Sequence, residues 1–166
     1  IMKDYTTPIE IELWIYEDTS KYQMAQIIQA NLKEIGIDVK IQTLELSSFL
    51  QLTAQGKHNA LIGLWYTSTG DADYGYYPLL HNNSRGGVGN RSFYNNQRVN
   101  TLLDEARKEP VKEKRKEKYE EIQEIILDEN PIIPIVYKTY NIGINKNIKG
   151  FKFNPNGNHI LENIEY

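Results

Sequence analysis

The sequence contains no cysteine among its 166 residues. Disulfide bonds, thiol catalysis and thiolate metal sites are therefore excluded. No apolar run approaches the roughly 20 residues of a membrane-spanning helix, and we expect no signal-peptide core in the first residues. The net charge is −3, so the chain lacks the strongly basic balance that is typical of nucleic-acid-binding domains.

Recognisable cofactor and catalytic motifs are also missing. The three histidines, His58, His81 and His159, are scattered without the spacing of a metal site. Ser68 is not part of a GxSxG elbow, and the Gly-rich segment at residues 82–96 lacks the spacing of a phosphate-binding loop. We therefore predict no bound metal and no cofactor.

The composition that remains favours a folded α/β domain. Hydrophobic residues make up 40% of the chain, and 166 residues suffice for one domain with a core. Apolar side chains alternate along residues 9–16 and 37–42, which predicts two strands. Helical spacing of apolar residues over 20–35, ended by Gly36, predicts a helix between them.

The rest of the chain extends this pattern. A short helix at residues 49–55 and a strand at 59–66 complete a β-α-β-α-β order, the signature of a mostly parallel sheet flanked by helices. Two helices follow, the second at about residues 111–128. We then predict a strand at residues 132–144, broken near its proline, and a last short strand at 162–166. Residues 1–8 are interpreted as a lead-in and 9–166 as a single α/β lobe.

The polar stretch after the third strand is the candidate site. Trp65 is followed by hydroxyl side chains and then by Asp71 and Asp73. In open α/β sheets, ligands bind beyond the carboxyl ends of the strands. The carboxylates are candidates for an acid/base pair, a metal site or an ammonium-binding site, and Asp73 is also a candidate helix N-cap. Arg85 and Arg91 flank the Gly-rich loop, and Arg91 is the better candidate for pairing with a ligand carboxylate.

Several segments together resemble a known family, the C-terminal lobe of bacterial extracellular solute-binding proteins of the peptide/nickel type. "NLKEIGIDVKI" is similar to the family's "LKKIGIDVEI", and "STGDADYGYYPLLH" to "GDPDNFLYPLFHS". "GNRSFYNNQRVNTLLDEAR" resembles "NxxxYxNPEVDxLLxEAR". The segments "EKRKEKYEEIQEIILDENPIIPIVY" and "NIKGFKFNPNGNHILENIEY" resemble "ExRxxLYxEAQxIIxEDAPxIPLYY" and "NVKGFxxNPxGxxxLxNVYL". The matches occur in the family's order along nearly the whole chain.

The resemblance implies a periplasmic-binding-protein-like lobe of a longer protein whose N-terminal lobe is not in this sequence. It implies a monomeric, non-enzymatic binding component of an ABC importer, which captures dipeptides, oligopeptides or glutathione-like peptides and delivers them to the permease. The implied location is extracytoplasmic, either periplasmic or lipid-anchored at the outer face of the cell membrane. Binding of nickel or another small solute, a peptide-sensing regulatory module, and a small hydrolase using the two aspartates remain as alternatives.

The resemblance also assigns roles in the candidate site. In peptide-binding members, an Asp three residues after the Trp pairs with the peptide ammonium group, and Ser68 stands at that position here. We therefore assign the ammonium contact to Asp71. Trp65 and Tyr66 are expected to form the pocket wall, and the hydroxyls of Ser68 and Thr69 to bind peptide groups.

Arg91 is the weaker candidate, for contact with a ligand carboxylate.

Overall fold

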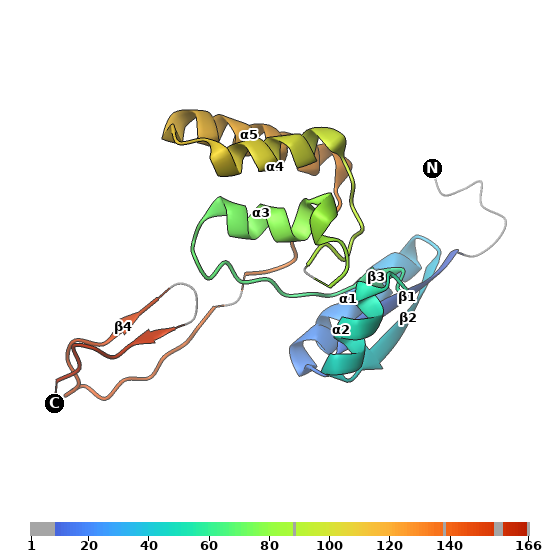
Figure 1. Ribbon diagram of the computed structural model, residues 1–166. Coiled ribbons are helices and arrows are strands. Elements are labelled where there is room, and N and C mark those ends of the chain that lie inside the picture. The colour runs from blue at the N-terminus through green and yellow to red at the C-terminus, as the bar shows by residue number, and fades with distance from the viewer. Residues whose placement is uncertain (1–8, 88, 138, 155–157, 166) are drawn as a thin grey trace.

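The computed structural model describes residues 9–87, 89–137, 139–154 and 158–165. Figure 1 shows a small sheet with helices packed on it, a separate layer of helices, and an arm that ends in a hairpin. None of the described helices is both long and apolar enough to cross a membrane. The expected lead-in at residues 1–8 lies outside the described residues.

The sheet is parallel, with the strand order β2-β1-β3, in which β3 is the short strand Ala60–Leu61. The strand β1 (Ile9–Tyr16) pairs along its whole length with β2 (Ile37–Leu44). Helix α1 (Thr19–Glu34) connects them and begins at Asp18, whose carboxylate accepts the Lys21 N–H at 3.0 Å. Gly36 adopts a left-handed φ of +83° just beyond the helix, as its position predicts. The β-α-β unit is confirmed.

Helix α1 and the sheet form one hydrophobic core. Its buried members come from β1, α1 and β2 and from the chain just after residues 60–61; they are Leu13, Ile15, Ala25, Val39 and Ile62. Helix α2 (Leu46–Ala54) lies against β1 through an edge-to-face contact between Phe49 and Tyr16. Because Tyr16 is one residue beyond Ile15 in the strand, α2 lies on the face opposite α1.

The third strand is shorter than the sequence predicts. The expected strand at residues 59–66 is limited to β3 (Ala60–Leu61), which pairs with Leu13 and Trp14. One more ladder bond follows, from the Ile62 N–H to the Trp14 oxygen at 3.0 Å. Beyond Ile62 the chain leaves the sheet and crosses to the helical layer (Figure 1).

The helical layer has a core of its own. It consists of α3 (Ala72–Leu80), α4 (Gln97–Lys108) and α5 (Lys112–Glu129), with the short 3₁₀ turn η1 (Asn82–Ser84) after α3. The buried side chains at its centre are Leu80, Val99, Leu102, Leu103, Ala106, Tyr119 and Ile122. The apolar sides of α4 and α5 therefore face each other and α3.

The predicted strand at residues 132–144 is not formed. In the described parts of this segment, 132–137 and 139–144, the structure assigns no strand. The chain instead runs extended to an antiparallel hairpin of β4 (Lys152–Phe153) and β5 (His159–Ile160), which the sequence did not predict. The expected strand at 162–166 is reduced to a single bridge between Glu165 and Lys149. We refer to residues 131–165 as the C-terminal arm.

The fold class is confirmed as an α/β lobe built on a parallel sheet flanked by helices. The main sheet is wholly parallel, and the antiparallel pair is separate from it.

Candidate ligand-binding loop

The candidate site is the loop that connects β3 to α3. It starts at the buried Ile62 and leaves the carboxyl end of β3, where parallel sheets bind ligands. Trp65, Tyr66, Ser68, Thr69 and Asp71 all belong to this one segment. The structure therefore brings five of the six predicted site residues together on one loop.

Two aromatic side chains stand at the first half of the loop. The Trp65 Nε1–H donates to the Tyr74 backbone oxygen at 2.9 Å, and the two rings lie 5.7 Å apart between centroids. Trp65 is thus fixed against the first turn of α3 and is half-buried. Tyr66 is 43% exposed, and its hydroxyl accepts a hydrogen bond from the Tyr140 hydroxyl of the arm at 3.1 Å. The two rings supply an aromatic wall with a polar tip.

A tight turn places the hydroxyl side chains next. The Gly70 N–H donates to the Thr67 oxygen at 3.2 Å, and Gly70 adopts a φ of +67°. Such a backbone conformation favours glycine, because residues with a side chain rarely adopt a positive φ. The Thr69 hydroxyl accepts the Asp71 N–H at 3.2 Å, and Ser68 is exposed at the tip of the turn.

Asp71 caps α3 and is clamped by an arginine from α5. Its Oδ1 accepts the Asp73 N–H at 2.8 Å. Both of its oxygens accept from the Arg115 guanidinium, Oδ1 at 2.6 Å and Oδ2 at 3.1 Å. Hydrogen bonding from Arg115 and from the Asp73 N–H lowers the pKa of Asp71, which keeps the carboxylate ionised. The Asp71 side chain is still 44% exposed.

Asp73 is not the helix cap that the sequence suggested. It lies in the first turn of α3, and its carboxylate forms a bidentate pair with Arg107 of α4, at 2.8 and 3.1 Å. The Arg107 guanidinium covers the Tyr77 ring at 3.7 Å, and Tyr77 stacks on the buried His81 ring at 4.2 Å. Asp71 takes the cap position because its extended backbone lets the side chain turn back onto the Asp73 N–H.

The arrangement does not resemble a hydrolytic centre. Both aspartates of the proposed acid/base pair are held by arginines in bidentate pairs, Asp73 by Arg107 and Asp71 by Arg115. Within the described part of the chain, no group of three or more His, Cys, Asp and Glu side chains gathers to hold a metal ion.

Arg91 lies away from the loop, at the other edge of the sheet. Its Nε donates to the Thr53 hydroxyl at 3.0 Å, near the end of α2, and its backbone oxygen lies 2.9 Å from His58 Nε2. Thr53 and His58 precede β3 and so lie near its amino end, whereas the candidate loop follows β3 and leaves from its carboxyl end. Burial lowers the pKa of Arg91, which lines a hollow of about 400 Å³ together with Gln55, Gly56, His58, Asn59, Ser92 and Phe93.

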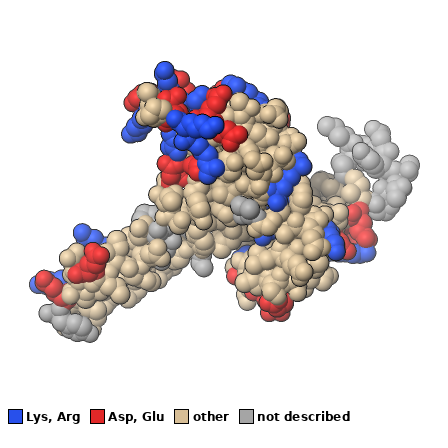
Figure 2. Space-filling model, in the orientation of Figure 1, with Lys and Arg blue, Asp and Glu red and all other residues tan. Residues whose placement is uncertain are grey.

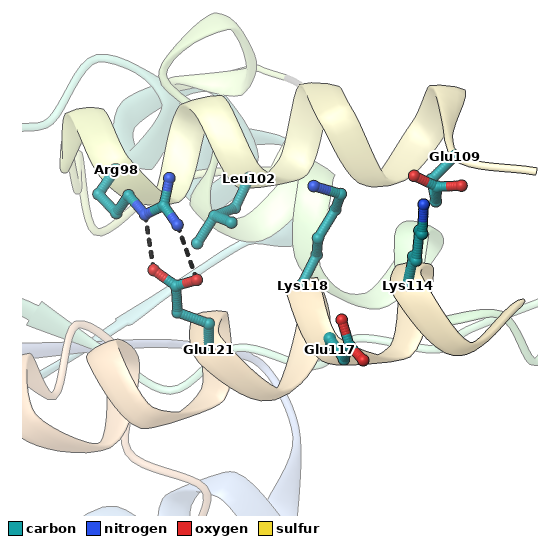
Figure 3. Close-up of a pocket in the computed structure, with 7 residues that line it drawn as sticks. All are labelled: Arg98, Leu102, Glu109, Lys114, Glu117, Lys118 and Glu121. Carbon is teal, nitrogen blue, oxygen red and sulfur yellow. Dashed lines mark hydrogen bonds and ion pairs between the residues drawn. The ribbon is translucent and has the colours of Figure 1, made fainter. Parts of the chain in front are cut away.

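A second hollow, of about 260 Å³, lies between α4 and α5. Figure 3 shows that it is lined mainly by charged side chains from both helices, and that Arg98 forms a bidentate pair with Glu121 across it. Lys118 also reaches Glu105 on α4, at 2.6 Å. These pairs join the two helices and account for the alternating charges of α5 as a solvated face.

A family model for the middle part of bacterial extracellular solute-binding proteins, family 5, matches residues 3–87, just over half of the chain. The chain belongs to this family of extracellular solute-binding proteins. Its members are non-enzymatic binding proteins, so the hydrolase alternative is not retained. The first-half motifs that suggested the family, together with the candidate loop, lie inside the matched region.

Three similar proteins extend the likeness over the rest of the chain. A probable D,D-dipeptide-binding periplasmic protein of Escherichia coli is 29% identical over 143 residues, which are 86% of this chain and 28% of that protein. The periplasmic binding protein DppA of Helicobacter pylori, solved in complex with a peptide, is 30% identical, with a TM-score of 0.71 over 77% of this chain and 25% of that one. HbpA2 of Haemophilus parasuis is 27% identical, with a TM-score of 0.85 over 97% of this chain and 32% of that one.

The chain therefore spans about a third or less of the length of these relatives. It corresponds to part of a family 5 binding protein.

Proposed function

We propose that this chain is the ligand-contacting lobe of a longer solute-binding protein that captures peptides outside the cytoplasm and delivers them to an ABC permease. The observation that carries the proposal is the loop between β3 and α3, which presents aromatic rings, hydroxyls and a carboxylate at the carboxyl edge of a parallel sheet. Peptide as the ligand class is supported by two of the relatives, which are described as dipeptide-binding or solved with a peptide.

The loop offers groups that match a peptide backbone. Trp65 and Tyr66 provide flat apolar walls, and the hydroxyls of Ser68 and Thr69 can exchange hydrogen bonds with peptide amides. Such a surface recognises the backbone of a peptide more than its side chains. Because the loop lies on the surface of one lobe, the other lobe of the longer protein would close over the ligand.

Asp71 is proposed as the contact for the peptide ammonium group. A carboxylate accepts about four hydrogen bonds; Oδ1 of Asp71 accepts two and Oδ2 one, from Asp73 and Arg115. The exposed part of the side chain can therefore accept an ammonium group without breaking the clamp. The contact of Arg91 with a ligand carboxylate remains a prediction, and any such contact would be made at the other edge of the sheet.

A thermal-shift screen of the longer protein tests this function against its alternatives. The probes are a dipeptide, a pentapeptide, glutathione and nickel chloride, each added separately. A ligand at 100 times its Kd stabilises the folded protein by about 2.7 kcal/mol, which is a measurable rise in Tm. We expect a rise in Tm with at least one peptide. A rise in Tm with nickel alone would instead favour the alternative that the protein binds nickel. A permease gene next to the gene of this protein would support a role in transport. A regulatory domain fused to the binding protein would support a role in peptide sensing.

A further inference from the structure

The hollow around Arg91 lies apart from the candidate loop. It is at the amino end of β3, whereas the loop leaves the carboxyl end of that strand. Three segments that are distant in the sequence form it: Gln55 and Gly56 just after α2, residues 58–59 before β3, and residues 91–93. Its volume is about 400 Å³, and none of its described lining residues is an aspartate or a glutamate. The hollow therefore combines one guanidinium with neutral polar groups and aromatic rings.

Arg91 is held in place by a hydroxyl and not by a carboxylate. Its Nε donates to the Thr53 hydroxyl at 3.0 Å; Thr53 is fully buried, and its own hydroxyl donates to the Phe49 oxygen at 2.6 Å. Within the described part of the chain, the bond to Thr53 is the only hydrogen bond of the guanidinium, and Arg91 forms no ion pair there. The N–H groups of its terminal nitrogens remain for a ligand, and their planar fork fits the oxygens of a carboxylate or a phosphate.

The arginines of the helical layer show how unusual this arrangement is. Arg98, Arg107 and Arg115 each pair with a carboxylate, although their side chains are 55%, 45% and 30% exposed. Figure 2 shows the same pattern on one face, where positive and negative side chains lie side by side over α4 and α5. Arg91 is half-buried without such a partner among the described residues, and burial lowers its pKa. Because a partly desolvated charge without a counter-charge is costly, an anion that enters the hollow is stabilised by pairing with Arg91.

Phe93 supplies an apolar wall to the same hollow. Its ring is 36% exposed, and its backbone φ is +55°, a value that residues with bulky side chains rarely adopt. Gly56 lets the ring approach closely, because a Cβ at residue 56 would lie 2.9 Å from Phe93 Cζ. Backbone strain of this kind clusters at binding sites, where the surrounding structure maintains it. An exposed ring in the hollow of an unpaired guanidinium favours an organic anion over an inorganic ion.

We propose that this hollow is a second binding site, for a small organic anion whose carboxylate or phosphate pairs with Arg91 and whose apolar part lies on the Phe93 ring. The side-chain amides of Gln55 and Asn59 line the same hollow and can donate to further oxygens of the anion. Because the candidate peptide loop lies at the other edge of the sheet, the longer protein should hold a peptide and the anion at the same time.

Calorimetric titration of the longer protein tests the second site. The probes are benzoate, phenyl phosphate, acetate and inorganic phosphate, each added separately at constant ionic strength. We expect benzoate or phenyl phosphate to bind with one site per protein, and more tightly than acetate or inorganic phosphate, which lack the ring. Equal and weak binding of all the probes, which is the behaviour of an adventitious ion only, would overturn the proposal. Absence of binding by every probe would overturn it as well.

Paired variants of the longer protein locate the bound anion. Arg91→Gln should weaken its binding about tenfold or more, because a charge-assisted bidentate contact is lost. Arg85→Gln changes an exposed arginine and should leave the affinity within about twofold. Phe93→Ala should remove the advantage of the ringed probes over acetate and inorganic phosphate. If Arg91→Gln fails to fold, Arg91→Lys keeps the charge without the planar fork and should still weaken binding severalfold. Unchanged affinity in the Arg91 variant would refute the site.

Competition with a peptide separates the second site from the proposed function. A saturating dipeptide should leave the affinity for the anion unchanged, and so should Asp71→Asn. Displacement of the anion by the dipeptide would place Arg91 in the peptide site and overturn a separate site. Binding of the anion without binding of any peptide would support the second site while refuting the proposed function.

Discussion

The clamp on Asp71 gives the sharpest prediction, because two substitutions separate its two roles. Asp71→Asn keeps a side-chain oxygen for the Asp73 N–H but loses the charge that pairs with Arg115. Asp71→Ala loses both. Asn and Asp are comparable N-caps, whereas replacement of a cap by Ala costs about 1 kcal/mol.

The expected losses of stability follow from the solvent exposure of the two paired side chains. The side chains of Asp71 and Arg115 are 44% and 30% exposed, so solvent screens their attraction and the pair stabilises the fold by about 0.5 to 1 kcal/mol. We expect Asp71→Asn to lower the free energy of unfolding by that amount, and Asp71→Ala by about 1.5 to 2 kcal/mol once the cap is added. In an Arg115→Gln background, the cost of Asp71→Asn should shrink toward zero.

The effect of pH on this pair has a defined sign. The pKa of Asp71 is lower in the folded than in the unfolded protein, where it is about 3.9. The pair therefore contributes its full stabilisation above the unfolded pKa and loses it as the pH falls through the folded pKa. The difference in stability between the wild type and Asp71→Asn should be constant near neutral pH and vanish in strong acid.

Urea unfolding at pH 7 and below pH 3 measures the stability changes, and calorimetry with a dipeptide measures binding in the longer protein. If Asp71 contacts the ammonium group, both variants should lose most of the binding, although only Asp71→Ala disturbs the cap. Asp38→Asn, on the exposed side of β2, serves as the matched control. Wild-type affinity in Asp71→Asn would refute the ammonium assignment, and equal stabilities of the two variants would refute the cap.

Three further predictions concern stability. Asn90 is fully buried, and its Nδ2 donates to the backbone oxygens of Leu80, His81 and Tyr94; Asn90→Ala should cost about 3 kcal/mol in urea unfolding because these acceptors lose their donor. Gly150→Ala should loosen the hairpin, seen as faster amide exchange there, because a Cβ would lie 1.6 Å from the Asn163 oxygen at a φ of +74°. Burial lowers the pKa of His58 below its usual 6.5. Neutral His58 is therefore fully compatible with the fold above about pH 6.5, and stability is lost as the pH falls through the lowered pKa. His58→Gln should flatten this pH dependence of Tm.

Local patterns in the sequence predicted the sheet and the helices well. The alternation in residues 9–16, the helical spacing before Gly36 and the apolar stripe of α4 depend on nearest neighbours and periodicity, and all three are found in the structure. The family motif "NxxxYxN" also acquires a physical reason. Asn90 holds the loop, the Tyr94 hydroxyl donates to Glu129, and Asn96 caps α4.

Features that depend on distant residues were missed. The cap was assigned to Asp73 because the sequence does not show that Arg107 and Arg115, 34 and 44 residues from their partners, bind the two aspartates. Arg91 was expected to contact the same ligand as the candidate loop, but the course of the chain places it beside Thr53 and His58, at the amino edge of the sheet. The apolar run at residues 132–144 has the composition of a strand. It has no partner strand in the described part of the chain, so the strand that composition predicted is not formed.

Calorimetric titration of the longer protein with a dipeptide, in parallel with glutathione and nickel chloride, tests the central claim most directly. We expect saturable binding of a peptide with one site per protein, lost in Asp71→Asn and retained in Asp38→Asn. Absence of binding by any peptide, or binding of nickel that Asp71→Asn leaves unchanged, would contradict it.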